Sequence, residues 1–333
     1  MLVYAVGSGL TANIYAATNG GGLSVSPDGG STWTTYTTAS PGGGLGSDYV
    51  NGVYAVGSGQ SADIYAATGG GGLSVSGDGG STWTTYTTAS PGGGLGSDYV
   101  NGVYAVGSGD TADIYAATGG GLSVSGDGGA NWTTYNPGNT RYGIGSYAVS
   151  GVYAVGSGQT ATIYAATGGG LSVSGDGGAT WTNYTTATTN GGLGSNTVRG
   201  VYAVGSGQTA TIYAATDGGL SISANGGATW TNYTTTSTNG GLGSNTVRGV
   251  YAVGSGPTAT IYAATNPTYN PNTRNFVGGG LSISQAAVAP GGNGGNGGNG
   301  GNGGTTGLGG KGGAAGSPGG TAGSNGTSGG NRV

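Results

Sequence analysis

The side chains best suited to chemistry are ten aspartates, and four of them occupy one position of a repeated motif. The motif reads Ser-Pro-Asp-Gly-Gly-Ser-Thr-Trp at residues 26–33 and returns in related form at 76–83, 125–132, 174–181 and 223–230. Carboxylates can act as general acids, as glycosidase nucleophiles or as metal ligands, but only where two or more converge. A residue that recurs in every repeat is more commonly there to build the repeat.

The other residue types that catalysis uses are scarce. The sequence has no Cys, no His and no Glu, so thiol, imidazole and zinc chemistry have no ligands or nucleophiles. Every aspartate except Asp110 and Asp217 recurs at its position in at least one other repeat. We therefore predict that the protein is not an enzyme and that it has no cofactor. Six basic residues in 333 are too few for a phosphate-binding face, which excludes nucleic acid.

The elements that must position these residues are short strands. Each unit contains Val-Tyr-Ala-Val, then Ile-Tyr-Ala-Ala-Thr, then Leu-Ser-Val-Ser, and finally Trp-Thr-x-Tyr after the Asp-Gly-Gly turn. Runs of four to six β-branched and aromatic residues bounded by Gly, Asn or Asp are typical of strands. Asp-Gly-Gly favours a tight hairpin because glycine accepts the positive φ angles that such turns need. Each unit therefore predicts one four-stranded antiparallel sheet.

Six such units begin at Val3, Val53, Val103, Val152, Val201 and Val250. The sixth lacks the Asp-Gly-Gly turn and reads Gln285 to Pro290 in its place, and it carries an insertion at residues 266–277. After Pro290 the sequence becomes Gly-Gly-Asn repeats and a Gly-rich tail. We predict a repeat domain over residues 1–289 and a low-complexity tail over 290–333, which is either a flexible linker or a polyglycine-type helix.

The repeated motif resembles the Asp-box, or BNR, repeat, and the resemblance covers residues 1 to about 284. The resemblance implies a β-propeller with the motif at the hairpin between the third and fourth strands, where its Asp and Trp stabilise the turn on the outer rim. Carboxylates spread around a rim do not converge, which favours a structural role. The structural residues are Asp28, Trp33, Asp78, Trp83, Asp127, Trp132, Asp176, Trp181, Asn225 and Trp230. Asn225 departs from the motif but can make the same local bonds.

The sequence therefore predicts an all-β fold, a β-propeller of six four-stranded blades, with a β-solenoid as the alternative. The sixth blade is the exception, because it has no recognisable fourth strand. Residues 285–289 are a candidate for a degenerate fourth strand. Otherwise the edge of the sixth blade stays open to a strand donated by another chain.

For function, we expect an extracellular structural or adhesive protein that self-associates, with a filament as one form. Low charge and many hydroxyl groups favour the extracellular location, and no apolar run reaches the ~18 residues that span a membrane. Residues 1–140 hold eight Asp and no base, whereas 141–333 hold two Asp and six bases, which favours head-to-tail contact. A carbohydrate-binding propeller is the alternative, and a glycoside hydrolase is a weaker one. Candidate contact residues are Tyr269, Arg274, Phe276, Arg199 and Arg248.

Overall fold

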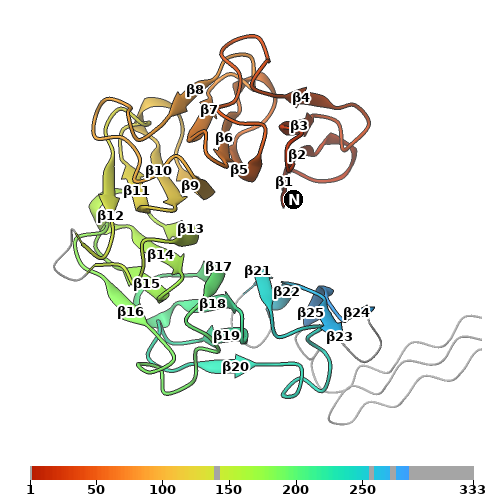
Figure 1. Cartoon of the computed structure of the whole chain (residues 1–333), viewed down its shortest axis with the longest axis vertical. Coiled ribbons are helices and arrows are strands. Elements are labelled where there is room, and N and C mark those ends of the chain that lie inside the picture. Colours follow the sequence, from red (N-terminus) through yellow and green to blue (C-terminus); the bar gives the residue numbers. More distant parts are fainter. Residues whose placement is uncertain (1, 139–142, 255–258, 271–274, 285–333) are drawn as a thin grey trace, which may run out of the picture. The chain divides into compact units, whose positions relative to one another are not determined.

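The computed structural model describes residues 2–138, 143–254, 259–270 and 275–284. These residues form six successive antiparallel sheets, the blades of a β-propeller (Figure 1). Within each blade the strands pair in chain order, so consecutive strands of blades one to five are joined as hairpins. The prediction of a six-bladed propeller is confirmed, and the alternative of a β-solenoid is wrong.

Blades one to five have four strands each, and the first strand of each blade is here called its inner strand. Their bounds are β1 (Leu2–Val6), β2 (Asn13–Ala17), β3 (Leu23–Ser26) and β4 (Thr34–Tyr36); β5 (Val50–Val56), β6 (Asp63–Thr68), β7 (Leu73–Ser76) and β8 (Thr84–Tyr86); β9 (Val100–Val106), β10 (Asp113–Thr118), β11 (Gly121–Ser125) and β12 (Thr133–Tyr135); β13 (Val149–Val155), β14 (Thr162–Thr167), β15 (Gly170–Ser174) and β16 (Thr182–Tyr184); β17 (Val198–Val204), β18 (Thr211–Thr216), β19 (Gly219–Ser223) and β20 (Thr231–Tyr233). One turn of 3₁₀ helix joins the first two strands of each: η1 (Gly9–Thr11), η2 (Gly59–Ser61), η3 (Gly109–Thr111), η4 (Gly158–Thr160) and η5 (Gly207–Thr209).

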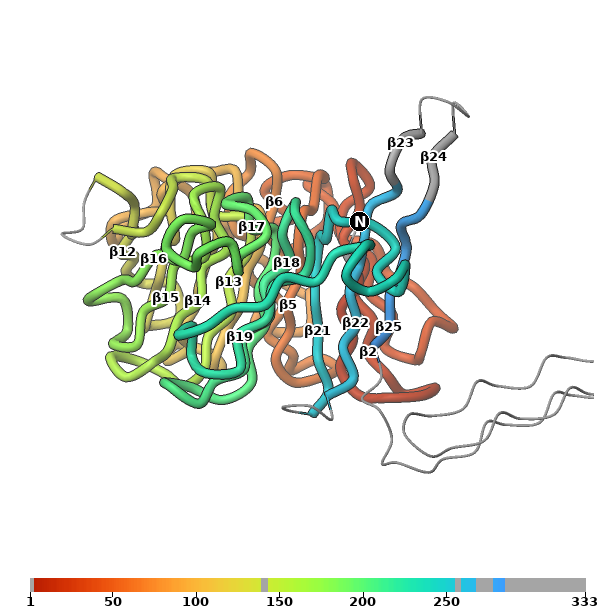
Figure 2. The backbone as a smooth tube through the Cα atoms, turned by 90° about the horizontal axis from the view of Figure 1, so that it is seen from below, coloured from red at the N-terminus to blue at the C-terminus, as the bar shows by residue number. Residues whose placement is uncertain are grey.

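Blade six has three described strands. They are β21 (Val247–Val253), β22 (Thr260–Thr265) and β25 (Gly280–Ser284), which lie side by side in that order (Figure 2). The insertion forms a separate hairpin of β23 (Thr268–Asn270) and β24 (Asn275–Val277), in which Tyr269 pairs with Phe276. The predicted fourth strand at 285–289, and the tail from 290, lie outside the described residues.

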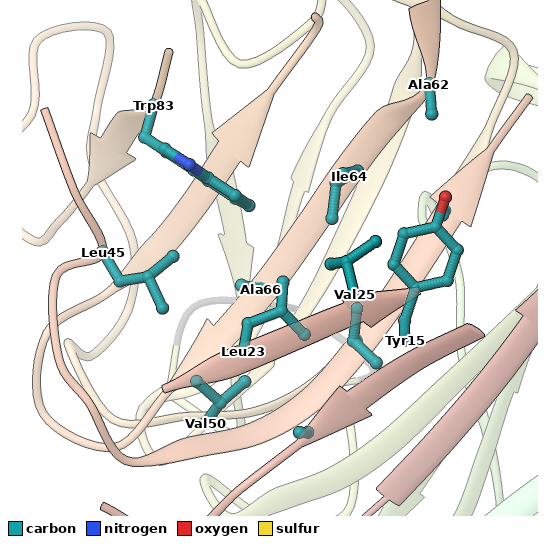
Figure 3. Close-up of a cluster of buried hydrophobic side chains, with 12 residues drawn as sticks. Tyr15, Leu23, Val25, Leu45, Val50, Ala62, Ile64, Ala66 and Trp83 are labelled. Atoms are coloured by element: carbon teal, nitrogen blue, oxygen red, sulfur yellow. The ribbon is translucent and has the colours of Figure 1, made fainter. Parts of the chain in front are cut away.

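The hydrophobic core lies between consecutive blades rather than inside one sheet. Between blades one and two, Tyr15 and Leu23 of the first blade meet Ile64, Ala66 and Trp83 of the second (Figure 3). The same positions repeat in the next three interfaces. A propeller blade is apolar on both faces for this reason, and its second strand is buried along its whole length, as in β6 and β10.

The inner strands of blades two to six carry a glycine as their third residue, which lets neighbouring inner strands approach closely. A Cβ atom built on Gly52 would lie 3.3 Å from both Asn101 O and Gly102 Cα of the next blade. On Gly200 it would lie 3.3 Å from Arg248 O and 3.5 Å from Gly249 Cα. Equivalent residues of neighbouring inner strands are therefore adjacent, and the starts of these strands gather at one face of the blades.

Candidate functional site

The four aspartates of the Asp-box motif accept hydrogen bonds within their own turns. The Asp78 carboxylate accepts hydrogen bonds from the Ser76 hydroxyl (2.8 Å), the Thr82 amide (2.8 Å) and the Thr82 hydroxyl (2.7 Å). The Gly80 amide in turn donates to Ser76 Oγ at 2.8 Å. Hydrogen bonds from Thr82 hold the pKa of Asp78 below its ordinary value, although partial burial opposes them.

The other copies of the motif repeat this arrangement. Asp28 and Asp176 bind the same types of partner, and Asp127 uses Asn131 in place of threonine. Asn225 accepts from the Thr229 amide at 2.8 Å and donates through Nδ2 to the Thr229 hydroxyl, also at 2.8 Å. The amide thus closes the turn as the carboxylates do. In the described part of the chain, no three acidic residues gather where they could hold a metal ion.

The motif's tryptophans reach the neighbouring blade, which the sequence did not predict. The Trp83 ring lies 5.4 Å from the Tyr36 ring of the preceding blade, and Trp132, Trp181 and Trp230 lie 5.5–5.6 Å from Tyr86, Tyr135 and Tyr184. Trp83 is 7% exposed, whereas Trp33 of blade one is 48% exposed. The motif therefore joins blades as well as closing a hairpin.

The inner strands carry one tyrosine each, and these six rings form a continuous series of tilted ring pairs across the blades. Neighbouring ring centroids are 4.7–4.9 Å apart along the series Tyr4, Tyr54, Tyr104, Tyr153, Tyr202 and Tyr251. Burial raises the pKa of Tyr153 to about 12, so its hydroxyl is neutral at physiological pH. Tyr4, Tyr54, Tyr104 and Tyr153 pack against the cores between blades, whereas Tyr251 is 53% exposed.

A different set of tyrosines is exposed where the inner strands begin. Tyr49, Tyr99 and Tyr147 are 51–55% exposed and precede β5, β9 and β13. Backbone pairing fixes the loops of the first two, because Tyr49 forms an isolated β-bridge with Asn19 and Tyr99 forms one with Gly69. The Asp48 carboxylate also accepts a hydrogen bond from the Thr38 amide at 2.7 Å. A Cβ atom on Gly20 would lie 3.5 Å from the Tyr49 ring, so this ring lies close to the backbone of Gly20. We call the starts of the inner strands with these tyrosines the strand-start face.

The second residue of the inner strands in blades two to six also belongs to the strand-start face, and it is Asn in blades two and three, Ser in blade four and Arg in blades five and six. Asn51 and Asn101 donate through Nδ2 to the Val100 and Val149 carbonyls of the next blade, at 2.9 and 2.8 Å. Blades five and six carry Arg199 and Arg248 at this position. The face therefore combines exposed aromatic rings with amide, hydroxyl and guanidinium donors.

Arg199 forms an ion pair with Asp217, which follows β18. Its Nε donates to Oδ1 at 2.9 Å and its Nη2 to Oδ2 at 2.6 Å, so the pair is bidentate. Hydrogen bonds from Arg199 hold the pKa of Asp217 below its ordinary value; burial opposes them and the charge of Arg248 adds to them. Arg248 is exposed and makes no hydrogen bond or ion pair within the described residues.

The structure thus brings together Arg199 and Arg248 of the predicted contact residues. Tyr269 and Phe276 pair in the β23–β24 hairpin, and Arg274 lies outside the described residues. The exposed tyrosines and Asp217 were missed. Asp217 could have been found, because it is one of two aspartates with no counterpart in another repeat.

Comparisons with known proteins support the fold. No family model matches the chain, and no curated protein matches it. Among solved structures, an ancestral GH74 enzyme is 17% identical with a TM-score of 0.55, covering 84% of this chain. The chain spans only 38% of that enzyme's length. At this identity the likeness shows the propeller fold alone.

Two further solved structures resemble the chain more weakly. YCF48 from Cyanidioschyzon merolae is 15% identical and has a TM-score of 0.48. The match covers 84% of this chain and 80% of the YCF48 chain. The SapL1 lectin, solved with alpha methyl fucoside, is 17% identical and has a TM-score of 0.42. The match covers 86% of this chain and 96% of the lectin. Within the described ranges, no helix is long and apolar enough to cross a membrane.

Proposed function

We propose that this protein is an extracellular, non-catalytic carbohydrate-binding propeller whose ligand lies on the strand-start face. The observation that carries the proposal is the exposure of Tyr49, Tyr99 and Tyr147 at one end of successive inner strands. An aromatic ring presents a negative π face, on which the C–H bonds of a sugar ring can pack. Tyrosine also supplies a large rigid contact area at a small entropic cost.

The polar groups of the strand-start face suit a sugar. Amide and hydroxyl groups can both donate and accept, as sugar hydroxyls require. Hydrogen bonds fix the loops that carry the tyrosines, because the Tyr49 amide donates to Ser47 Oγ at 3.2 Å and the Tyr99 amide donates to Ser97 Oγ at 3.1 Å. A prepositioned set of rings and donors keeps the entropic cost of binding low.

The non-catalytic part of the proposal follows from where the carboxylates act. Glycoside hydrolysis commonly uses two carboxyl groups about 5–9.5 Å apart around the scissile bond. The motif aspartates each bind within their own turn, and Asp217 is neutralised by Arg199. The composition, with 5% charged residues and many hydroxyl groups, supports the extracellular location.

A glycan array probed with the full chain tests the proposal. We expect binding to a limited set of glycans, and a double variant, Tyr49→Ala with Tyr99→Ala, that binds them about tenfold or more weakly, because each lost stacking contact is worth about 0.5–1.5 kcal/mol. Tyr233→Ala on β20 is the matched control, since Tyr233 is also exposed but lies on a fourth strand. Silence across the array, or unchanged binding by the double variant, would refute the proposal.

Self-association is a second candidate function, favoured by the apolar surface of blade one. Val3, Leu10 and Trp33 are 58%, 83% and 48% exposed. Val53 and Trp83, their counterparts in blade two, are buried against blade one, and Leu10 is replaced by Gln or Asp in blades two to five. We propose that a second copy of the chain packs on this surface, as one blade packs on the next.

Sedimentation velocity across a concentration series tests self-association. We expect the weight-average sedimentation coefficient to rise with concentration for the native chain. It should stay constant for a double variant, Leu10→Gln with Trp33→Ser, because Gln already stands at the Leu10 position in blades two, four and five. A native chain that sediments as one monomeric species at all concentrations would refute this second proposal and leave the first intact.

A further inference from the structure

Blade five shows how an arginine on the strand-start face binds a planar oxyanion. Arg199, the second residue of β17, reaches Asp217, the first residue after β18. The two parallel bonds, of 2.9 and 2.6 Å, have the fork geometry in which a guanidinium binds a carboxylate best. The backbone of Asp217 is fixed by its amide, which donates to the Thr197 carbonyl at 3.2 Å.

Blade six repeats the arginine but not the acid. Arg248 is the second residue of β21, and Asn266 is the first residue after β22. The Asn266 amide donates to the Thr246 carbonyl at 2.9 Å, the counterpart of the bond that fixes Asp217. The side chain at 266 therefore leaves the backbone from the same place, but it is a neutral amide with no hydrogen bond to Arg248.

The result is a positive charge on blade six with no acidic partner among the described residues, while the acids Asp48 and Asp98 of the strand-start face precede the inner strands of blades two and three. Arg199 and Asp217 neutralise each other, whereas Arg248 has no partner within the described residues. The positive charge of Arg248 acts on the neighbouring blade and helps to lower the pKa of Asp217. The backbones of the two blades are close here, since a Cβ on Gly200 would lie 3.3 Å from Arg248 O.

We propose that Arg248 binds the carboxylate of an acidic sugar, in the same two-bond geometry in which Arg199 binds Asp217. The inference rests on the proposed carbohydrate-binding function and names the class of ligand, a glycan that contains hexuronate. A sulfated sugar shares the oxyanion chemistry. The carboxylate is favoured because the ion pair in blade five matches the planar fork of arginine to a planar group.

Binding of oligogalacturonate and of its methyl ester, measured by calorimetry at low salt, tests this inference. The two probes share the same sugar backbone and differ at the carboxyl group, which is an anion in one and a neutral methyl ester in the other, so their ratio of affinities reports the carboxylate. We expect the native chain to prefer the acid about tenfold, a typical value for one charge-assisted contact at a partly exposed site. Arg248→Gln should remove the preference.

A second variant tests the mechanism without removing the arginine. Asn266→Asp should give Arg248 an internal carboxylate, as in blade five, and should abolish the preference for the acid. The same change already exists at Asp217, so the variant is compatible with the fold. Gln60→Glu in η2 is the control, because it adds the same charge at the opposite end of an inner strand and should leave the preference unchanged.

The outcomes separate the inference from the proposed function. Equal binding of the acid and the ester by the native chain, or a preference that survives Arg248→Gln, overturns the inference while carbohydrate binding stands. A stronger preference for sulfated than for carboxylated oligosaccharides overturns the choice of carboxylate. If neither probe binds, nor any glycan on the array, both the inference and the function fail.

Discussion

Replacing Trp83 and Trp33 in separate variants tests whether the Asp-box tryptophan joins blades. The two residues occupy the same position of the same turn, and each indole Nε1 donates to a glycine carbonyl of its own turn at 3.0 Å. They differ in their surroundings, because Trp83 is 7% exposed and packs on Tyr36, whereas Trp33 is 48% exposed. Any difference between the variants therefore reports contacts between blades.

The expected magnitudes follow from burial. Trp83→Ala leaves a cavity in the core between blades one and two, which costs about 3–5 kcal/mol for a buried tryptophan. Loss of the aromatic pair with Tyr36 is included in that figure and accounts for about 0.5–1.5 kcal/mol of it. Trp33→Ala removes about half as much buried surface and no pair with Tyr, so we expect about 1–2 kcal/mol.

Urea denaturation followed by far-UV circular dichroism measures both variants, at a protein concentration low enough for the native chain to be monomeric. Slopes that match the native chain allow the midpoints to be compared as free energies of unfolding. Equal losses for Trp83→Ala and Trp33→Ala would refute the reasoning, because they would place the whole effect inside the hairpin. A larger loss for Trp33→Ala would do so even more clearly.

Three further predictions concern the turns, the inner strands and the ion pair. Asp78→Asn should reduce the loss in the free energy of unfolding that the native chain shows at acid pH. The folded pKa of Asp78 lies below its unfolded value of about 3.9, so its contribution to the free energy of unfolding is complete above that pH and is lost as the pH falls through the folded value. Urea midpoints measured between about pH 5 and 2 check this prediction. The same pH dependence in the variant and in the native chain would contradict it. Gly52→Ala should cost about 1–3 kcal/mol, because the new Cβ meets backbone at 3.3 Å, whereas Gly249→Ala, with open space, should change stability by less than about 0.5 kcal/mol; equal effects in thermal melts would contradict the close packing. Asp217→Asn should free Arg199 and raise affinity for oligogalacturonate, at a stability cost of about 0.5–1 kcal/mol for an ion pair that is about one-third exposed; weaker binding in calorimetry would contradict it.

The repeat made the fold predictable because each unit has to bury two faces. The hairpin turns and the four strands can be read from local signals, such as Asp-Gly-Gly before Trp-Thr-x-Tyr. The partner of Trp83 could not be read in this way, because Tyr36 lies in the preceding repeat and its distance depends on how two blades pack. Sequence spacing shows what recurs in every blade, but it does not show which copy a recurring residue contacts.

The strand-start face was harder to predict for the same reason. Tyr49 and Tyr147 occupy different positions in their loops, and only the structure shows that both side chains are exposed before an inner strand. Arg199 and Arg248 occupy equivalent positions of the repeat, so the sequence alone does not distinguish them. The structure separates the two residues, because Asp217 pairs with Arg199, whereas Arg248 has no partner among the described residues.

Recurrence and variation therefore divide the residues of this chain into two groups with different roles. Positions that recur, such as Asp78 and Gly52, have their bonding capacity used by a turn or by close packing, and a ligand would have to compete with the fold for them. Positions that vary at equivalent places on one face are used in different ways: Asn51 donates to the next blade, Arg199 pairs with Asp217, and Arg248 has no partner among the described residues. Because the backbone at these positions is nearly the same in each blade, a change of one side chain alters the surface without altering the fold. We therefore expect the binding specificity of this propeller to depend on the departures from its repeat, and its stability to depend on the repeat itself.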